Sequence, residues 1–148
     1  MKPLVNTKPI VLFLCSGNSV RSQMAEAFLR ELGSDRFEAR SAGLEPTDIH
    51  PLTHAVMNEV GINLEGHRAK SVQEFLGKIS ATYVIFVCKE GEANCPKLWP
   101  FALRTERMPF VDPAKASGTE EEQIAVFRRV RDEIQLAIAD WLKTEVHE

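Results

Sequence analysis

Apolar and polar residues along the chain form two kinds of pattern, short apolar runs and longer stretches with helical periodicity. The apolar runs contain β-branched and aromatic residues, which favour buried strands. They predict strands at residues 9–14, 37–41, 81–87 and 107–111. The run at 81–87 is the strongest of these signals, whereas the run at 107–111 is a weaker one.

Helical periodicity lies between the predicted strands and after the last of them. Apolar residues three and four apart predict a helix that ends at Gly33 and a second over residues 51–60, and residues 71–76 predict a short one. Thr119 and Glu122 form a capping-box pattern at the start of a long final helix. The apolar stripe of this final helix is Ile124, Phe127, Val130, Ile134, Ile138 and Trp141.

Strands that alternate with helices predict an α/β fold, in which a parallel sheet is flanked by helices on both faces. Ligands of such sheets bind at the carboxyl ends of the strands. Cys15 and Cys88 each follow a predicted strand, and Asp112 follows a third. We therefore expect these three side chains at one edge of the sheet.

Length and composition limit the possible functions. The chain has 148 residues, which fits one domain over residues 1–148, and 44% of them are hydrophobic, enough for a core. The net charge of −3 gives no reason to expect nucleic acid or an anionic membrane as partner. No apolar stretch approaches the ~20 residues of a membrane span, and residues 1–7 are too short and polar for a secretory signal. We expect a cytoplasmic protein.

The three cysteines are Cys15, Cys88 and Cys95. Their odd number argues against a static disulfide framework. A metal site is not expected, because the sequence has no Cys-x-x-Cys or His-x-x-His pair. Two interpretations of the cysteines remain, as inert buried thiols or as redox-active thiols. The polar, glycine-containing segment between Cys88 and Cys95 favours the redox-active interpretation.

The residues after the first strand predict an oxyanion-binding loop that leads into a helix. The loop is Cys15-Ser16-Gly17-Asn18-Ser19-Val20-Arg21-Ser22. Backbone N–H groups of such a loop and of the helix N-terminus bind tetrahedral anions, and Gly17 and Asn18 permit the tight turn. Arg21 offers a planar fork for two oxygens, and Ser22 can donate a hydrogen bond to a Cys15 thiolate. The pattern predicts a thiol nucleophile beside a bound oxyanion.

This loop resembles the active-site loop shared by low-molecular-weight protein tyrosine phosphatases and thioredoxin-coupled arsenate reductases. The resemblance extends over residues 9–142 and includes Gln23-Met24-Ala25-Glu26 and Ser41-Ala42-Gly43. It implies a four-stranded parallel sheet flanked by helices, with Asp112 as the general acid that protonates the leaving oxygen. The phosphatases usually carry an aromatic residue after this Asp-Pro, where this chain has Ala114, which argues against an aryl phosphate substrate.

The segment from Cys88 to Pro96 resembles the redox segment of the arsenate reductases, including its Asn-Cys-Pro ending. This resemblance implies that Cys15 attacks arsenate, Cys88 attacks Cys15, Cys95 attacks Cys88, and thioredoxin reduces the final disulfide. It implies no bound cofactor or metal, and we expect a monomer. Two other functions stay open: a phosphatase acting on phosphotyrosine or small phosphate esters, and a non-catalytic redox sensor.

The spacing of Cys88 and Cys95 predicts a conformational change. On a regular helix, residues seven apart lie ~10.5 Å apart along the axis, whereas a disulfide needs Cα atoms within ~4.4–6.8 Å. The segment is therefore either irregular or must unwind. We expect it to rearrange between the reduced and the oxidised form.

A group of residues behind the loop matches a cation site of some relatives. Asn18, Glu26 and Ser41 match positions that surround a potassium ion there, and a further acidic residue follows the Gly-His segment. This chain has Lys70 at that point. Because the Lys70 ammonium can take the place of the cation beside Glu26, we expect little potassium dependence.

Overall fold

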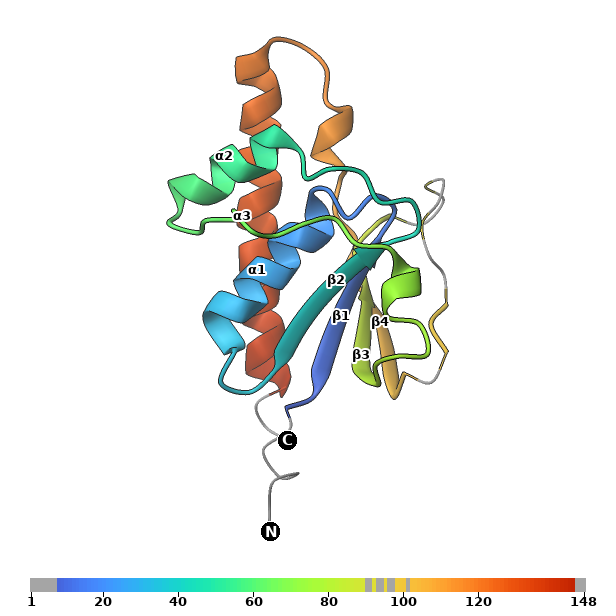
Figure 1. Cartoon of the computed structure of the whole chain (residues 1–148). Helices are drawn as coiled ribbons and strands as arrows, with labels where there is room; N and C mark the ends of the chain where they lie inside the picture. Colours follow the sequence, from blue (N-terminus) through green and yellow to red (C-terminus); the bar gives the residue numbers. More distant parts are fainter. Residues whose placement is uncertain (1–7, 90–91, 93–94, 96–97, 101, 146–148) are drawn as a thin grey trace.

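Four strands form one parallel sheet in the order β2-β1-β3-β4 (Figure 1). The computed structural model describes residues 8–89, 92, 95, 98–100 and 102–145. The strands are β1 (Ile10–Cys15), β2 (Glu38–Gly43), β3 (Ala81–Phe86) and β4 (Arg104–Arg107). The predicted α/β fold with a four-stranded parallel sheet is confirmed.

Three α-helices pack against one face of this sheet (Figure 1). They are α1 (Arg21–Gly33), α2 (Pro51–Glu59) and α3 (Glu120–Glu145), with 3-10 turns η2 (Val72–Glu74) and η3 (Pro113–Lys115). The predicted capping box of α3 is confirmed, because the Thr119 N–H donates to Glu122 Oε1 at 2.8 Å and the Glu122 N–H donates to Thr119 Oγ1 at 3.1 Å. In the part of the chain that the structure describes, no helix combines the length and the apolar composition of a membrane span.

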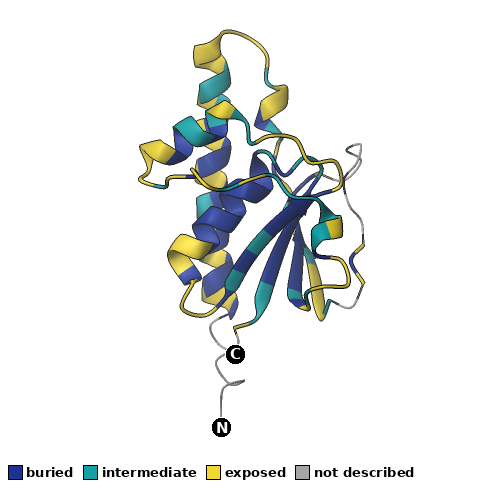
Figure 2. Ribbon diagram, viewed as in Figure 1, coloured by how far each residue is buried: buried dark blue, intermediate teal, exposed yellow. Residues whose placement is uncertain are grey.

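The alternation of side chains along β1 builds a core on each face of the sheet. Val11 and Phe13 pack with apolar residues of all three α-helices, whereas Leu12 and Leu14 pack on the opposite face with Trp99. That second face is covered, within the described residues, by Trp99 and by the region of η2 rather than by an α-helix. The helix predicted at 71–76 is thus a 3-10 turn. The ribbon is buried along most of the two central strands, β1 and β3 (Figure 2).

The last strand lies earlier in the chain than the sequence predicts. The strand predicted at 107–111 is β4 at Arg104–Arg107, so this prediction was wrong in its bounds. As an edge strand that pairs only with β3, β4 carries charged, largely exposed side chains and lacks an apolar signature. The apolar residues that follow continue beside β3, where the Met108 N–H donates to Phe86 O at 2.9 Å and the Phe110 N–H donates to Val87 O at 3.1 Å.

Candidate active site

Cys15 lies at the carboxyl end of β1, where the chain turns into the loop before α1. It is a free thiol with only 2% of its surface exposed. Its Sγ lies 2.9 Å from Ser22 Oγ and accepts a hydrogen bond from the Asn18 N–H at 3.2 Å. A hydroxyl and a backbone N–H thus contact this sulfur close to the N-terminus of α1. The arrangement therefore suits a nucleophilic thiolate.

Asn18 fixes the shape of the loop from inside the protein. It is fully buried and adopts the left-handed conformation, with φ of 51°. Its amide donates to Ser22 Oγ at 2.7 Å and to Ser41 Oγ at 2.9 Å. The side-chain oxygen of Asn18, Oδ1, accepts from the Lys70 N–H at 2.8 Å and from Gln23 Nε2 at 3.0 Å. Asn18 thus ties the loop to β2, to α1 and to the segment that precedes η2.

Gly43 lets the end of β2 approach this loop very closely. A Cβ atom at this position would lie 2.5 Å from Ser16 O and 2.9 Å from Asn18 N, both backbone atoms of the loop. The sequence marks Gly43 only as part of the familiar Ser-Ala-Gly run, without its packing role. Only a glycine leaves room for the loop at this point.

The guanidinium of Arg21 is buried and faces acidic and carbonyl oxygens. Its Nη1 lies 2.7 Å from Glu92 Oε2 and its Nη2 lies 2.9 Å from Glu92 Oε1, which is a two-point ion pair. Nη1 also donates to Phe110 O at 3.0 Å, and Nη2 lies 3.6 Å from Asp112 Oδ2. Burial alone would lower the pKa of Arg21, but these partners hold it above its ordinary value. Burial also opposes ionisation of Glu92, yet Arg21 keeps the pKa of that carboxyl low.

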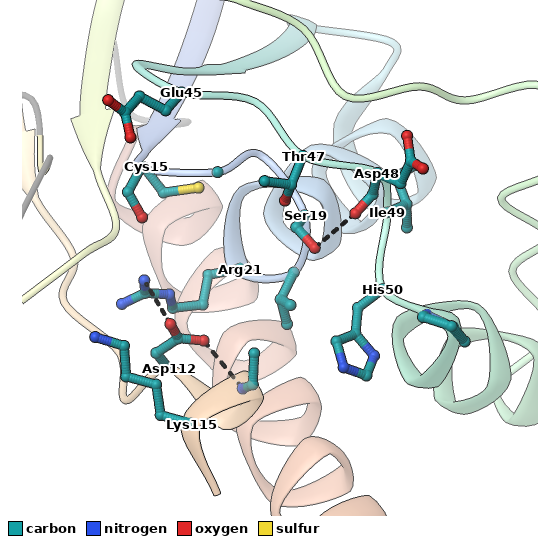
Figure 3. A pocket seen from close by; sticks show the side chains of 15 residues that line it. Cys15, Ser19, Arg21, Glu45, Thr47, Asp48, Ile49, His50, Asp112 and Lys115 are labelled. Carbon is teal, nitrogen blue, oxygen red and sulfur yellow. Dashed lines mark hydrogen bonds and ion pairs between the residues drawn. The ribbon is translucent and has the colours of Figure 1, made fainter.

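Asp112 lies beside Arg21, and both residues line a cleft of about 570 Å³ (Figure 3). Its Oδ1 accepts from the Ala114 N–H at 3.0 Å and so caps η3, while Oδ2 points toward Arg21. His50 and Ala114 also line the cleft. Of the predicted site residues, those that line the cleft are Cys15, Ser16, Gly17, Ser19, Val20, Arg21 and Asp112.

Cys88 and Cys95 form a disulfide with their Cα atoms 6.1 Å apart. Cys88 is fully buried two residues beyond β3, and Cys95 is 8% exposed. Arg107, at the end of β4, donates to Cys88 O at 3.0 Å and so anchors the backbone at Cys88. The Cα separation is far below the ~10.5 Å that seven helical residues would span.

Lys70 and Glu26 meet behind the loop. Glu26 is 3% exposed, accepts a hydrogen bond from Ser41 Oγ, and pairs with Arg30 at 2.5 Å and with Lys70 Nζ at 3.7 Å. Lys70 Nζ also lies 3.5 Å from Ser41 Oγ and donates to Arg68 O at 3.0 Å. Burial lowers the pKa of Lys70, and the charge of Glu26 only partly offsets this. Because an ammonium lies among the oxygens that would hold potassium, these residues do not fit a potassium ion.

Gln23 and Glu92 are among the site residues that escape prediction from the sequence. Gln23 is buried and its amide bridges Asn18 to Arg68 O, yet in the sequence it is an ordinary helical glutamine. Glu92 lies in a polar segment that offers no periodic signal. Its contact with Arg21 is a long-range one that only the structure reveals.

A buried thiol between a strand and a helix, with an arginine and an aspartate beside it, defines the class of enzymes that attack tetrahedral oxyanions with a cysteine. The family model described as low molecular weight phosphotyrosine protein phosphatase matches residues 10–148. The chain belongs to this family.

The similar proteins include several arsenate reductases. The arsenate reductase of Shouchella clausii is 42% identical over 138 residues, which cover 93% of this chain and 98% of that protein. A solved structure of an arsenate reductase in its oxidized state has a TM-score of 0.74 at 33% identity, covering 88% of this chain and 94% of its own. A thioredoxin-dependent arsenate reductase of Corynebacterium glutamicum has a TM-score of 0.67 at 27% identity, covering 93% of this chain and 60% of its own.

Proposed function

We propose that this chain reduces arsenate to arsenite through a covalent adduct on Cys15 and a disulfide relay through Cys88 and Cys95. The observation that carries the proposal is a closed Cys88–Cys95 disulfide at the sheet edge that holds the Cys15 loop. A phosphatase that only hydrolyses esters has no use for such a pair. The arsenate reductases among the similar proteins support the same substrate.

The first step forms a sulfur–arsenic bond. The Cys15 thiolate attacks the arsenic of bound arsenate, the bond between arsenic and its hydroxyl oxygen breaks, and this hydroxyl leaves as water with a proton that the Asp112 carboxyl group donates. Arg21 and the loop amides hold the remaining oxygens. The arsenic is still in its +5 state in this adduct.

The second step reduces the arsenic. The Cys88 thiolate attacks Cys15 Sγ, a Cys15–Cys88 disulfide forms, and the electron pair of the broken sulfur–arsenic bond stays on arsenic, which leaves as arsenite. The Cys95 thiolate then attacks Cys88 and releases the Cys15 thiolate. The balance is one arsenate reduced by two electrons for each Cys88–Cys95 disulfide formed.

The register of the sheet supports the transfer between Cys15 and Cys88. Leu14 of β1 pairs with Phe86 of β3, and the Val87 N–H donates to Leu14 O at 3.0 Å. Cys15 therefore lies level with Val87 on the neighbouring strand, and Cys88 is the next residue. Neighbouring strands lie about 4.8 Å apart, which places the two cysteines within a short movement of each other.

Thioredoxin is the external reductant in this proposal. Its reduction potential of about −270 mV suits a protein disulfide that must be recycled in every turnover, and the Corynebacterium glutamicum relative is itself thioredoxin-dependent. Such recycling needs a reducing compartment, so we infer the cytoplasm. All three cysteines belong to one chain, so a monomer is sufficient.

The test is NADPH oxidation coupled through thioredoxin reductase and thioredoxin, started with arsenate. The wild-type chain should turn over continuously. Cys95→Ser should release about one arsenite per protein and then stop as the Cys15–Cys88 disulfide. Cys88→Ser, its matched control, should release none, because nothing resolves the adduct. Continuous arsenate turnover by Cys88→Ser would contradict the relay.

A phosphatase acting on small phosphate esters is the second candidate, favoured by the family match and by a cleft that extends past Asp112 to His50. It needs Cys15, Arg21 and Asp112 but neither of the other cysteines. Cys88→Ser should therefore keep any hydrolysis of a small alkyl phosphate at the wild-type rate while losing arsenate reduction. Loss of both activities together would point to a folding defect, which thermal unfolding detects.

A further inference from the structure

The side chain of Glu92 lies where a bound oxyanion would need the arginine fork. Both of its oxygens contact Arg21, at 2.7 and 2.9 Å. A carboxylate and a tetrahedral oxyanion use the same two-point geometry on a guanidinium. One fork cannot hold both at these distances.

Every terminal nitrogen of Arg21 already faces protein oxygens. Nη1 contacts Glu92 and Phe110 O, and Nη2 contacts Glu92 and lies 3.6 Å from Asp112. Only 2% of the surface of Arg21 is exposed. A substrate oxyanion can therefore gain these N–H groups only if Glu92 moves.

We propose that Glu92 is an internal competitor of the substrate: in the Cys88–Cys95 disulfide form it occupies Arg21, and this form binds tetrahedral oxyanions much more weakly than the dithiol form. The proposal rests on the proposed function, because it assigns the two forms to two stages of the relay. The spent enzyme then rejects new arsenate until its disulfide has been reduced.

The disulfide and the position of Glu92 are connected through the backbone. Glu92 lies between the two bonded cysteines, the Glu92 N–H donates to Lys89 O at 3.2 Å, and the Cys95 N–H donates to Glu92 O at 3.4 Å. The Lys89 N–H donates to the Glu92 carboxylate at 3.0 Å. These turns hold the carboxylate toward Arg21 within the loop that the disulfide closes. Reduction removes the covalent closure, and the loop no longer has to keep these turns.

Charge adds to the competition for the fork. Glu92, whose pKa Arg21 keeps low, adds a negative charge directly beside the guanidinium. Lys115 lines the same cleft in either case. An incoming oxyanion thus meets an occupied fork and a like charge in the disulfide form.

The test compares the affinity for inorganic phosphate of the dithiol and the disulfide form by calorimetry. Phosphate is not reduced, so the result does not depend on arsenate turnover. The loss of two charge-assisted hydrogen bonds predicts that the wild-type disulfide form binds roughly tenfold to a hundredfold more weakly. In Glu92→Gln, with thiol titration confirming the disulfide, the two forms should agree within about threefold.

Glu45→Gln is the matched control, because it removes an equal charge from the lining of the same cleft. It should change the phosphate affinity of both forms by the same factor, so the difference in affinity between the dithiol and the disulfide form should remain. Equal affinities of the two wild-type forms, or a full gap in Glu92→Gln, would overturn the proposal. Failure of the proposed function would appear instead as absent arsenate turnover, whatever phosphate does.

Thermodynamic linkage between phosphate binding and disulfide reduction allows a second measurement. If phosphate prefers the dithiol form, it must raise the reduction potential of the Cys88–Cys95 pair by the same coupling. Each tenfold preference corresponds to about 30 mV for this two-electron couple. Saturating phosphate should therefore raise the wild-type potential by at least that amount and leave the potential of Glu92→Gln nearly unchanged. An equal rise of the reduction potential in both proteins would count against the proposed role of Glu92.

Discussion

Gly43→Ala tests whether the close approach of β2 to the loop shapes the site. The new methyl group would lie 2.5 Å from Ser16 O, 2.9 Å from Asn18 N and 3.0 Å from Gly17 C. All three are backbone atoms, so no side chain can rotate away to make room. Moving Ser16 O from 2.5 Å to an ordinary contact distance of 3.4 Å requires a shift of about 0.9 Å.

Both stability and activity should fall by amounts that follow from this shift. Overpacking of a well-packed site costs about 1–3 kcal/mol, which for a chain of this length lowers the melting temperature by roughly 2–12 °C. Misplacement of catalytic groups by about 1 Å costs on the order of 100-fold in rate. Alkylation of Cys15 should slow as well, because the Asn18 N–H that now lies 3.2 Å from its sulfur moves away.

The assays are thermal unfolding, arsenate turnover, and iodoacetamide labelling of the disulfide form, in which Cys15 is the free thiol. Gly17→Ala is the control within the same loop, since its methyl group would meet first the side-chain atom Thr47 Oγ1, at 3.2 Å. Its effects should be clearly smaller. If Gly43→Ala matched Gly17→Ala in stability and in Cys15 labelling, the packing argument would be refuted.

Two further predictions concern charged pairs. Replacing NaCl by KCl at equal ionic strength should leave the wild-type melting temperature unchanged, and a clear potassium effect would contradict this prediction. Lys70→Met should lower the free energy of unfolding by about 1–3 kcal/mol, because buried Glu26 loses one of its charged partners. Hydrogen bonds from Arg128 and Arg131 lower the pKa of Glu59 from 4.5 to about 2, so its ionised form stabilises the fold above pH 4.5 and this contribution is lost as the pH falls to about 2. Glu59→Gln should therefore be less stable than the wild type near pH 6 and match it near pH 2 in chemical denaturation, and a constant difference would refute the linkage.

Local pattern predicts the parts of the fold that are buried on both sides or amphipathic. β3 is a continuous apolar run, and α3 carries an apolar stripe with a capping box, so both are visible in the sequence. The edge strand β4 is not, because its side chains are charged and its position follows from pairing with β3. An edge strand depends on its partner more than on its own residues.

The site divides in the same way between local and long-range contributions. Cys15, Asn18 and Arg21 lie within seven residues of one another. Together with the strand before them, Gly17, Ser22 and the helix after them, they predict an oxyanion site. Lys70 contacts this loop through its N–H, which donates to Asn18 Oδ1, and its carbonyl oxygen accepts from the Gly43 N–H at the end of β2. No local sequence pattern displays these long-range bonds. Glu92 contacts Arg21 across 71 residues of sequence, and no local pattern displays that contact.

Asp112 and Glu92 contact the same guanidinium but are anchored in different ways. Asp112 caps η3 through the Ala114 N–H and is followed by buried Pro113, so its position depends on local structure that includes neither cysteine of the disulfide. Glu92 is held by turns inside the disulfide loop. Under the proposal for Glu92, reduction frees Arg21 from Glu92 while Asp112, the proposed general acid, stays in place. Arg21 would then exchange a carboxylate for the substrate without any rearrangement of the groups that perform the first step.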